Sequence, residues 1–435
     1  MSVLRAFIIS FSVIFSHNLF AANSFKTEKW QTKNGVRVVF YQAMEVPMLD
    51  ISLAFAAGSA YDGKYFGLSA LTTNLINQGN SGKDATTIAE ALADTGAQFN
   101  AETSRDMVVL SLRTLTSKEA LQQSTKTFSQ IISHPDFPKK AFTREKDQLL
   151  MAVEQTEESP DDVAIQNFFK TLYQEHPYAH PVHGTVESLN AIKENQVIDF
   201  YKKYFVAKNG ILVMVGAIDS SQAHQLAEQL TQDLPAGEPA PTIPKASQLA
   251  DAEKINVPFP SSQTVVRLGQ IGIDHHNQNY FPLMVGNYIL GGGTLVSRLG
   301  TEVREKRGLT YGIDSQFVPM LGEGPFIISL STKNSEARNA LHITQDTLIK
   351  FIKNGPNKEE LTSAKQYLTG SFPLSLGSNT NIANLLLRMA FYHLPDNYLD
   401  TYVAKINAVT DAEIRQAFQQ QVNPEKLLLV TVGQS

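Results

Sequence analysis

The chain repeats one hydrophobic pattern at the start of each of its halves. An apolar stretch over residues 49–56 leads through a polar turn to Tyr65-Phe66-Gly67-Leu68, which opens a predicted helix. A second apolar stretch over residues 265–271 leads in the same way to Tyr280-Phe281-Pro282-Leu283, 215 residues later. Short apolar runs bounded by turns predict buried strands, so each region is expected to form a strand followed by a helix.

The ends of the two halves repeat as well. The apolar stretches 211–215 and 427–432 are predicted strands, and the glycines that close them, Gly216 and Gly433, lie 217 residues apart. Two offsets that agree within two residues at both ends of a unit indicate an internal duplication.

Residues 234–260 separate the two halves and contain six of the chain's 19 prolines, a composition that favours an extended linker. At 435 residues the chain is also too long for one ordinary hydrophobic core. We therefore predict an α+β protein of two tandem homologous domains, over residues 23–233 and 261–435. The order of strands and helices in each half favours a mostly antiparallel sheet with helices packed on one face.

The N-terminus resembles a secretory signal peptide. Arg5, the apolar run 6–15 and the small residues Ala21 and Ala22 supply its charged, apolar and cleavage regions. The apolar run is too short for a membrane span; an N-terminal anchor or a buried helix is the alternative interpretation. We predict that residues 1–22 are removed on export and that the protein is periplasmic or secreted, with no stable membrane span.

Composition excludes several kinds of chemistry. The chain has no cysteine, which excludes disulfides, a lipoprotein anchor and thiolate metal ligands. Its formal net charge is −5 and no basic stripe is present, so nucleic acid is not an expected partner. Any active chemistry must use histidine, carboxylates, hydroxyls or arginine.

Residues 67–75, at the start of the first predicted helix, resemble the zinc motif of the insulinase-like and mitochondrial-processing-peptidase-like inverted zincins. That motif reads Gly-Leu-Ala-His-x-x-Glu-His, and residues four apart share one helix face, so its two histidines can hold one Zn²⁺. In this chain the three functional positions are Ala70, Thr73 and Asn74. None of these side chains supplies an imidazole or a carboxylate.

The family's third zinc ligand is a glutamate that follows a supporting glutamate by seven residues. The matching run here has Glu145 at the supporting position and Ala152 at the ligand position. The resemblance therefore implies that every zinc ligand has been lost together. We expect no metal or other cofactor in this chain, and expect zinc in a partner subunit.

Histidines elsewhere offer a weaker alternative. The segment 176–184 contains His176, His180 and His183, whose spacing could suit a relocated metal site. Two prolines stiffen this segment and the family has a similar His-Pro-Tyr loop without metal, so a structural loop is the favoured interpretation. His275 and His276 lie in a predicted polar turn, where we expect them to be solvated.

The second half retains a second family motif, over residues 290–299 and 302–312. The resemblance implies that Arg304 and Tyr311 help hold the substrate carbonyl as charge develops on it, because both side chains are hydrogen-bond donors. A helix end capped by Gly308 would explain the same segment without any function. Gly291, Gly292 and Gly293 lack the ending of a phosphate loop, so close packing or passage of a peptide is expected there instead.

The resemblance implies dimers of two-domain subunits, in some of which one chain holds zinc and the other supplies the Arg and Tyr pair. We therefore expect a non-catalytic subunit of a periplasmic zinc endopeptidase, with a zinc-bearing family member and peptide substrates as its partners. The alternative is a peptide-binding or assembly protein of the same fold with no proteolytic role.

Overall fold

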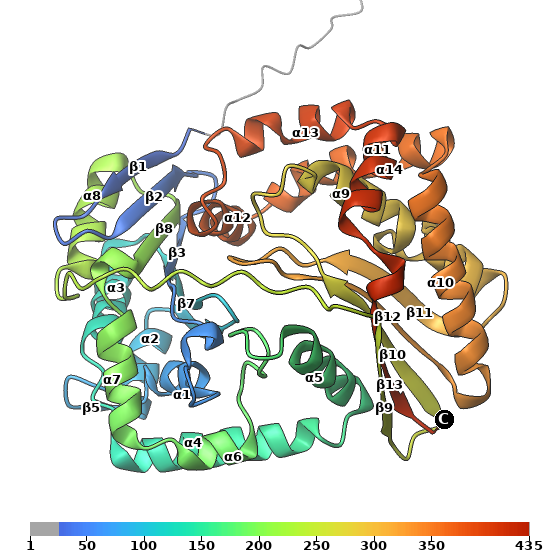
Figure 1. The fold of residues 1–435 in the computed structure, drawn as a ribbon. Helices are drawn as coiled ribbons and strands as arrows, with labels where there is room; N and C mark the ends of the chain where they lie inside the picture. The colour runs from blue at the N-terminus through green and yellow to red at the C-terminus, as the bar shows by residue number, and fades with distance from the viewer. Residues whose placement is uncertain (1–25, 435) are drawn as a thin grey trace, which may run out of the picture.

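A computed structural model describes residues 26–434, and the predicted signal peptide lies outside this range. The two halves of the chain form two sheets, each with its own set of helices (Figure 1). The predicted α+β class with two tandem halves and mostly antiparallel sheets is confirmed. Within residues 26–434 no helix is long and apolar enough to cross a membrane.

The first sheet contains six strands. All neighbouring pairs are antiparallel except one parallel pair, which joins the first and last long strands of this half. In sheet order the strands are β1 (Glu28–Gln31), β2 (Arg37–Gln42), β8 (Gly210–Gly216), β3 (Met48–Phe55), β7 (Val108–Leu115) and β6 (Gln98–Thr103).

The helices of the first half share one core with this sheet. Their buried faces carry aliphatic and aromatic side chains such as Leu71, Phe128 and Phe200, which explains why amphipathic segments fold onto the sheet here. The set comprises α1 (Leu68–Leu75), α2 (Ala85–Ala93), α3 (Lys118–Ser133), α4 (Lys139–Thr156), α6 (Val186–Ala191), α7 (Glu194–Tyr204) and α8 (Ser220–Thr231), with a small hairpin of β4 (Gly79–Asn80) and β5 (Lys83–Asp84).

The second sheet contains five strands and a corresponding layer of helices. In order the strands are β11 (Thr310–Phe317), β12 (Pro325–Lys333), β10 (Gln263–Ile271), β13 (Leu428–Gly433) and β9 (Glu253–Pro258). Only β13 and β9 pair in parallel. The helices are α9 (Tyr280–Asn287), α10 (Ala337–Asn354), α11 (Lys358–Ser371), α13 (Tyr398–Ala408) and α14 (Asp411–Gln421).

Only part of the predicted linker 234–260 is free of regular secondary structure. Residues 235–252 contain no helix or strand, whereas residues 253–258 form β9. This strand lies at the edge of the second sheet, where Pro258 is tolerated because its missing N–H leaves no ladder partner unpaired.

Each sheet is covered on its second face by a helix from the other half, which the sequence did not predict. Helix α5 (Pro160–Tyr173) packs on β10 and β13 through buried residues that include Phe168. Helix α12 (Asn379–Phe391) packs in the same way on β3 and β8, as seen in the middle of Figure 1. Apart from α5 and α12, the helices of each half pack with their own sheet as predicted, and the helix from the other half adds a second covered face: both faces of each sheet carry apolar side chains, and exposing either would leave a hydrophobic surface in water.

Asp106 joins the two halves at a buried position. Its carboxylate accepts hydrogen bonds from the Tyr178 hydroxyl at 2.5 Å, the Leu321 backbone N–H at 2.9 Å and the Tyr392 hydroxyl at 3.1 Å. Burial raises the pKa of the Asp106 carboxyl, and these donors oppose the rise. Since the donors come from both halves, the site ties the two domains together.

Candidate functional site

Helix α1 positions the residues that correspond to the zinc motif. Its first turn is fixed by Asp62, whose carboxylate accepts from the Gly67 and Ser69 N–H groups at 2.7 Å each. Gly67 has φ +91°, a left-handed conformation that favours glycine. Burial raises the pKa of the Asp62 carboxyl well above its ordinary value, against the opposing effect of the backbone donors.

The residues at the zinc positions do not suit a metal ion. Ala70 and Thr73 are buried, Asn74 is exposed, and Ala152 is exposed on the neighbouring helix α4. The Thr73 hydroxyl donates to the Ser69 carbonyl at 2.9 Å and accepts from the Thr103 hydroxyl at 2.8 Å. A methyl group, an engaged hydroxyl and an amide cannot replace two imidazoles and two carboxylates.

Glu145, at the supporting position of the motif, forms an ion pair. Glu145 lies on α4 and pairs with Arg144 at 3.1 Å, and the Arg144 guanidinium also bonds the Gln78 side chain. Within residues 26–434 no group of three or more histidine and carboxylate side chains is arranged to hold a metal ion.

The histidine loop 176–184 makes structural contacts. One ring nitrogen of His176 lies 2.8 Å from the Pro244 carbonyl, and the other accepts from the Tyr178 N–H at 3.1 Å. His180 stacks on Phe66 with ring centroids 4.2 Å apart. The loop therefore holds the linker against the first domain.

His275 is not solvated, which corrects the expectation for the turn. It is 8% exposed and its ring packs on Tyr392 with centroids 4.0 Å apart, whereas His276 is exposed. Burial lowers the pKa of the His275 imidazole to about 4, and the Arg388 and His276 charges add to this effect. The histidine is therefore neutral at physiological pH, part of the joint between the halves.

Arg304 and Tyr311 lie at the outer edge of the second sheet. Arg304 belongs to a short π-helical segment, Gly300–Glu305, and Tyr311 belongs to the edge strand β11. Arg304 is exposed and Tyr311 is 88% exposed, and within residues 26–434 neither side chain has a hydrogen-bond or ion-pair partner. Both donors are thus free to meet another molecule.

The capping role of Gly308 is also present. Gly308 has φ +62°, its N–H donates to the Arg304 carbonyl at 2.8 Å, and the Leu309 N–H donates to the Val303 carbonyl at 3.0 Å. These bonds close the helical segment but engage only the backbone of Arg304. The cap explains why a glycine stands at position 308, but it does not explain why position 304 carries an arginine side chain.

The three glycines have different surroundings. A Cβ on Gly291 would lie 2.5 Å from the Ser315 nitrogen, so close packing against β11 requires glycine there. Gly292 is exposed, and a Cβ on Gly293 would lie 2.9 Å from the Tyr288 carbonyl oxygen. Packing explains two of the three positions.

Comparison with known proteins agrees with these features. Residues 37–186 match the family described as insulinase (peptidase family M16), and residues 191–368 match the family described as the peptidase M16 inactive domain. A crystal structure of a peptidase M16 inactive domain from Pseudomonas fluorescens is 36% identical, with a TM-score of 0.91 over 94% of this chain and 98% of that one. The chain belongs to peptidase family M16.

Relatives of this M16 protein have mixed descriptions. The non-peptidase homolog YmxG of Helicobacter pylori is 26% identical over 403 residues, 92% of each protein. An uncharacterized zinc protease of Rickettsia felis is 27% identical over 338 residues, 77% of this chain and 80% of the relative. Together with the residues at the zinc positions, these matches identify an M16 homologue of the inactive type, consistent with a non-catalytic role.

Sequence reasoning missed three contributors to this region. Thr103 contacts α1 only through the fold, Asp62 binds the first turn of α1 from a few residues before it, and Arg298 pairs with Glu360, which lies 62 residues further along the chain. Only Asp62 had a sequence signal, as an acidic residue shortly before a helix start.

Proposed function

We propose that this M16 protein is the non-catalytic subunit of a heteromeric periplasmic zinc endopeptidase. In this role Arg304 and Tyr311 bind the backbone of a peptide held at the active site of a zinc-bearing M16 partner. The observation that carries the proposal is the contrast between the two halves. The zinc positions hold no imidazole or carboxylate and the Thr73 hydroxyl is already bonded, while both donors of the second motif are exposed and unpaired within residues 26–434.

The chemistry of the two side chains fits this role. A guanidinium presents fixed donors and stays charged, and a phenol adds one hydroxyl donor. Donors aimed at a carbonyl oxygen stabilise the negative charge that develops there when a nucleophile attacks, and their effect is largest where water is excluded. A partner that supplies the metal would supply the nucleophile, and this chain would supply the donors.

The experiment is reconstitution with a zinc-bearing M16 subunit that has an intact His-x-x-Glu-His motif. Pairing, melting temperature and cleavage of an unstructured fluorogenic peptide are measured for Arg304→Ala and Tyr311→Phe. We expect normal pairing and a fall of about 100-fold or more in turnover for each direct contact. Matched controls are Arg338→Ala and Tyr367→Phe, exposed residues on α10 and α11 for which turnover should stay unchanged.

Two results would contradict the proposal. Normal pairing with full turnover in both variants would favour the peptide-binding or assembly alternative. Lost pairing together with a lower melting temperature would assign Arg304 and Tyr311 a structural role instead.

A further inference from the structure

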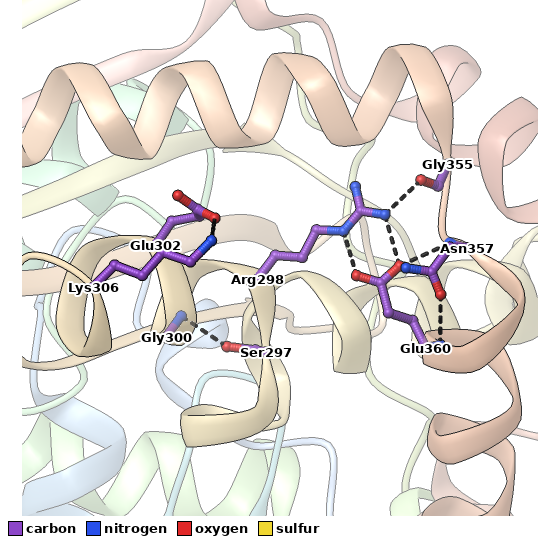
Figure 2. A network of polar contacts seen from close by, with 8 residues as sticks. All are labelled: Ser297, Arg298, Gly300, Glu302, Lys306, Gly355, Asn357 and Glu360. Carbon is purple, nitrogen blue, oxygen red and sulfur yellow. Dashed lines mark hydrogen bonds and ion pairs between the residues drawn. The ribbon is translucent and has the colours of Figure 1, made fainter.

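Arg298 forms an ion pair with Glu360, whereas the proposed donors Arg304 and Tyr311 have no side-chain partner within residues 26–434. Its guanidinium donates two bonds to the Glu360 carboxylate, at 2.6 and 2.7 Å, and a third to the Gly355 carbonyl at 2.9 Å. It also lies over the Phe351 ring, 5.0 Å from the centroid. Figure 2 shows this side chain reaching from the helical segment that leads to Glu302 across to the turn that carries Gly355 and Asn357.

Glu360 is itself held in place. Its carboxylate accepts from the Asn357 N–H at 2.8 Å, and its own N–H donates to the Asn357 side chain at 2.9 Å, which caps the start of α11. The acceptor of the Arg298 bonds is therefore fixed by a helix cap. A two-bond arginine–carboxylate pair of this kind sets orientation as well as distance.

The other end of Arg298 is attached to the segment that carries Arg304. The preceding residue, Ser297, is 1% exposed, and its hydroxyl accepts from the Gly300 N–H at 3.0 Å while its carbonyl accepts from the Thr301 N–H at 2.9 Å. These bonds start the π-helical segment Gly300–Glu305. A displacement of residues 297–298 would therefore move Arg304 directly.

The chain before this point is held mainly by short local bonds, such as the one from the Ser297 hydroxyl to the Thr294 carbonyl at 2.6 Å. Thr294 has φ +48°, and Leu295 and Val296 are 46% and 75% exposed. The π-helical hydrogen-bond pattern that follows is rare and frequently occurs at functional sites. Since the Arg304 side chain has no partner of its own within residues 26–434, the backbone segment sets the point from which its guanidinium can reach a substrate.

We infer that Arg298 is a positioning residue, which through Glu360 and Gly355 holds the segment Gly300–Glu305 so that Arg304 meets the substrate carbonyl. This inference rests on the proposed function. It assigns to the network in Figure 2 the role of setting the geometry of a donor that lies in another part of the site.

The test uses Arg298→Met in the full mature chain reconstituted with the zinc-bearing partner. We expect a fall of about 10- to 100-fold in turnover, because small displacements of a donor are costly in the transition state. In an Arg304→Ala background the same change should cost no more than about twofold, since a residue that acts through Arg304 has nothing left to position. The control is Lys350→Met, which breaks the exposed Lys350–Asp346 pair; both of these residues line the same surface pocket as Arg298 and Glu360, and turnover should stay unchanged.

Hydrogen exchange in the unpaired chain gives a second readout. The Gly300 and Thr301 amides should exchange at least about 10-fold faster in Arg298→Met, because the bonds lost involve charged groups. If that variant fails to fold, Glu360→Gln replaces it, since the amide oxygen can keep the Asn357 cap while the negative charge is lost. For Glu360→Gln we expect the same loss of turnover and faster amide exchange, each smaller than in Arg298→Met.

The outcomes separate the two proposals. Full turnover in Arg298→Met beside impaired Arg304→Ala overturns the positioning role and leaves the proposed function standing. A further large loss on adding Arg298→Met to Arg304→Ala also overturns it, because the two residues then act independently. Full turnover in Arg304→Ala overturns the proposed function, and the positioning role with it.

Discussion

The Thr103 hydroxyl donates to the Thr73 hydroxyl at 2.8 Å, inside the first domain and at the position where an active M16 peptidase has its catalytic glutamate. The Thr73 hydroxyl in turn donates a hydrogen bond to the Ser69 carbonyl. A buried glutamate at this position would need a metal-bound water or another partner to offset its desolvation. In this chain the position is a neutral, internally bonded contact between α1 and β6.

The first prediction concerns metal content. The purified chain should contain no stoichiometric zinc and should not cleave unstructured peptides, because the four zinc positions carry Ala70, Thr73, Asn74 and Ala152. Elemental analysis and a fluorogenic peptide assay check this. About one tightly bound zinc per chain that disappears in a triple alanine variant of His176, His180 and His183 would refute it. Substoichiometric metal would not, because exposed histidines scavenge ions.

The second prediction concerns pH. The pKa of His275 is about 4 in the folded chain and has an ordinary value of 6.5. The unfolded chain therefore binds the proton first, and the stability that neutral His275 contributes is present above pH 6.5 and is lost as pH falls from 6.5 to 4. Between pH 7 and pH 4.5 the unfolding free energy should fall by about 1–2 kcal/mol more in the wild type than in His275→Phe.

Urea unfolding at the two pH values measures this difference. The control is Leu374→Ala at a 78% exposed position, which removes no titratable group and should leave the pH dependence as in the wild type. An equal fall in the wild type and His275→Phe would show that His275 is not responsible.

The third prediction concerns helix α5, which belongs to the first half and packs on the sheet of the second half. Phe168 is fully buried, and a Cβ on Gly269 of β10 would lie 2.9 Å from its ring, so the ring packs directly on the second sheet. Phe168→Ala should lower the unfolding free energy by about 3–5 kcal/mol, whereas Leu374→Ala at a 78% exposed position should change it by less than about 0.5 kcal/mol.

Denaturant unfolding followed by both circular dichroism and tryptophan fluorescence tests the third prediction further. The single tryptophan, Trp30, lies in the first domain, so loss of a contact with the second sheet should still shift its transition if the halves unfold together. If the midpoint of the Trp30 fluorescence transition is the same in Phe168→Ala as in the wild type, helix α5 does not couple the unfolding of the two domains.

The sequence determined what depends on local pattern and residue chemistry. Apolar runs at matching offsets predicted two α+β halves, since burial of periodic apolar faces is decided within a few turns or strands. Ala70, Thr73, Asn74 and Ala152 likewise showed that the positions of the family's zinc motif carry no imidazole or carboxylate, because ligand chemistry belongs to the side chain and not to its surroundings.

Only the tertiary structure decided what depends on distant partners. Three kinds of contact join segments that are far apart in the chain. Helices α5 and α12 each pack on the sheet of the other half, His275 is buried against Tyr392, and Arg298 pairs with Glu360. A polar turn predicts solvation unless another element covers it, and an arginine in a motif shows no acceptor until the fold supplies one. These contacts follow from how distant segments pack together, between the halves for α5 and α12 and within the second half for the other two, and hydrophobic periodicity does not encode them.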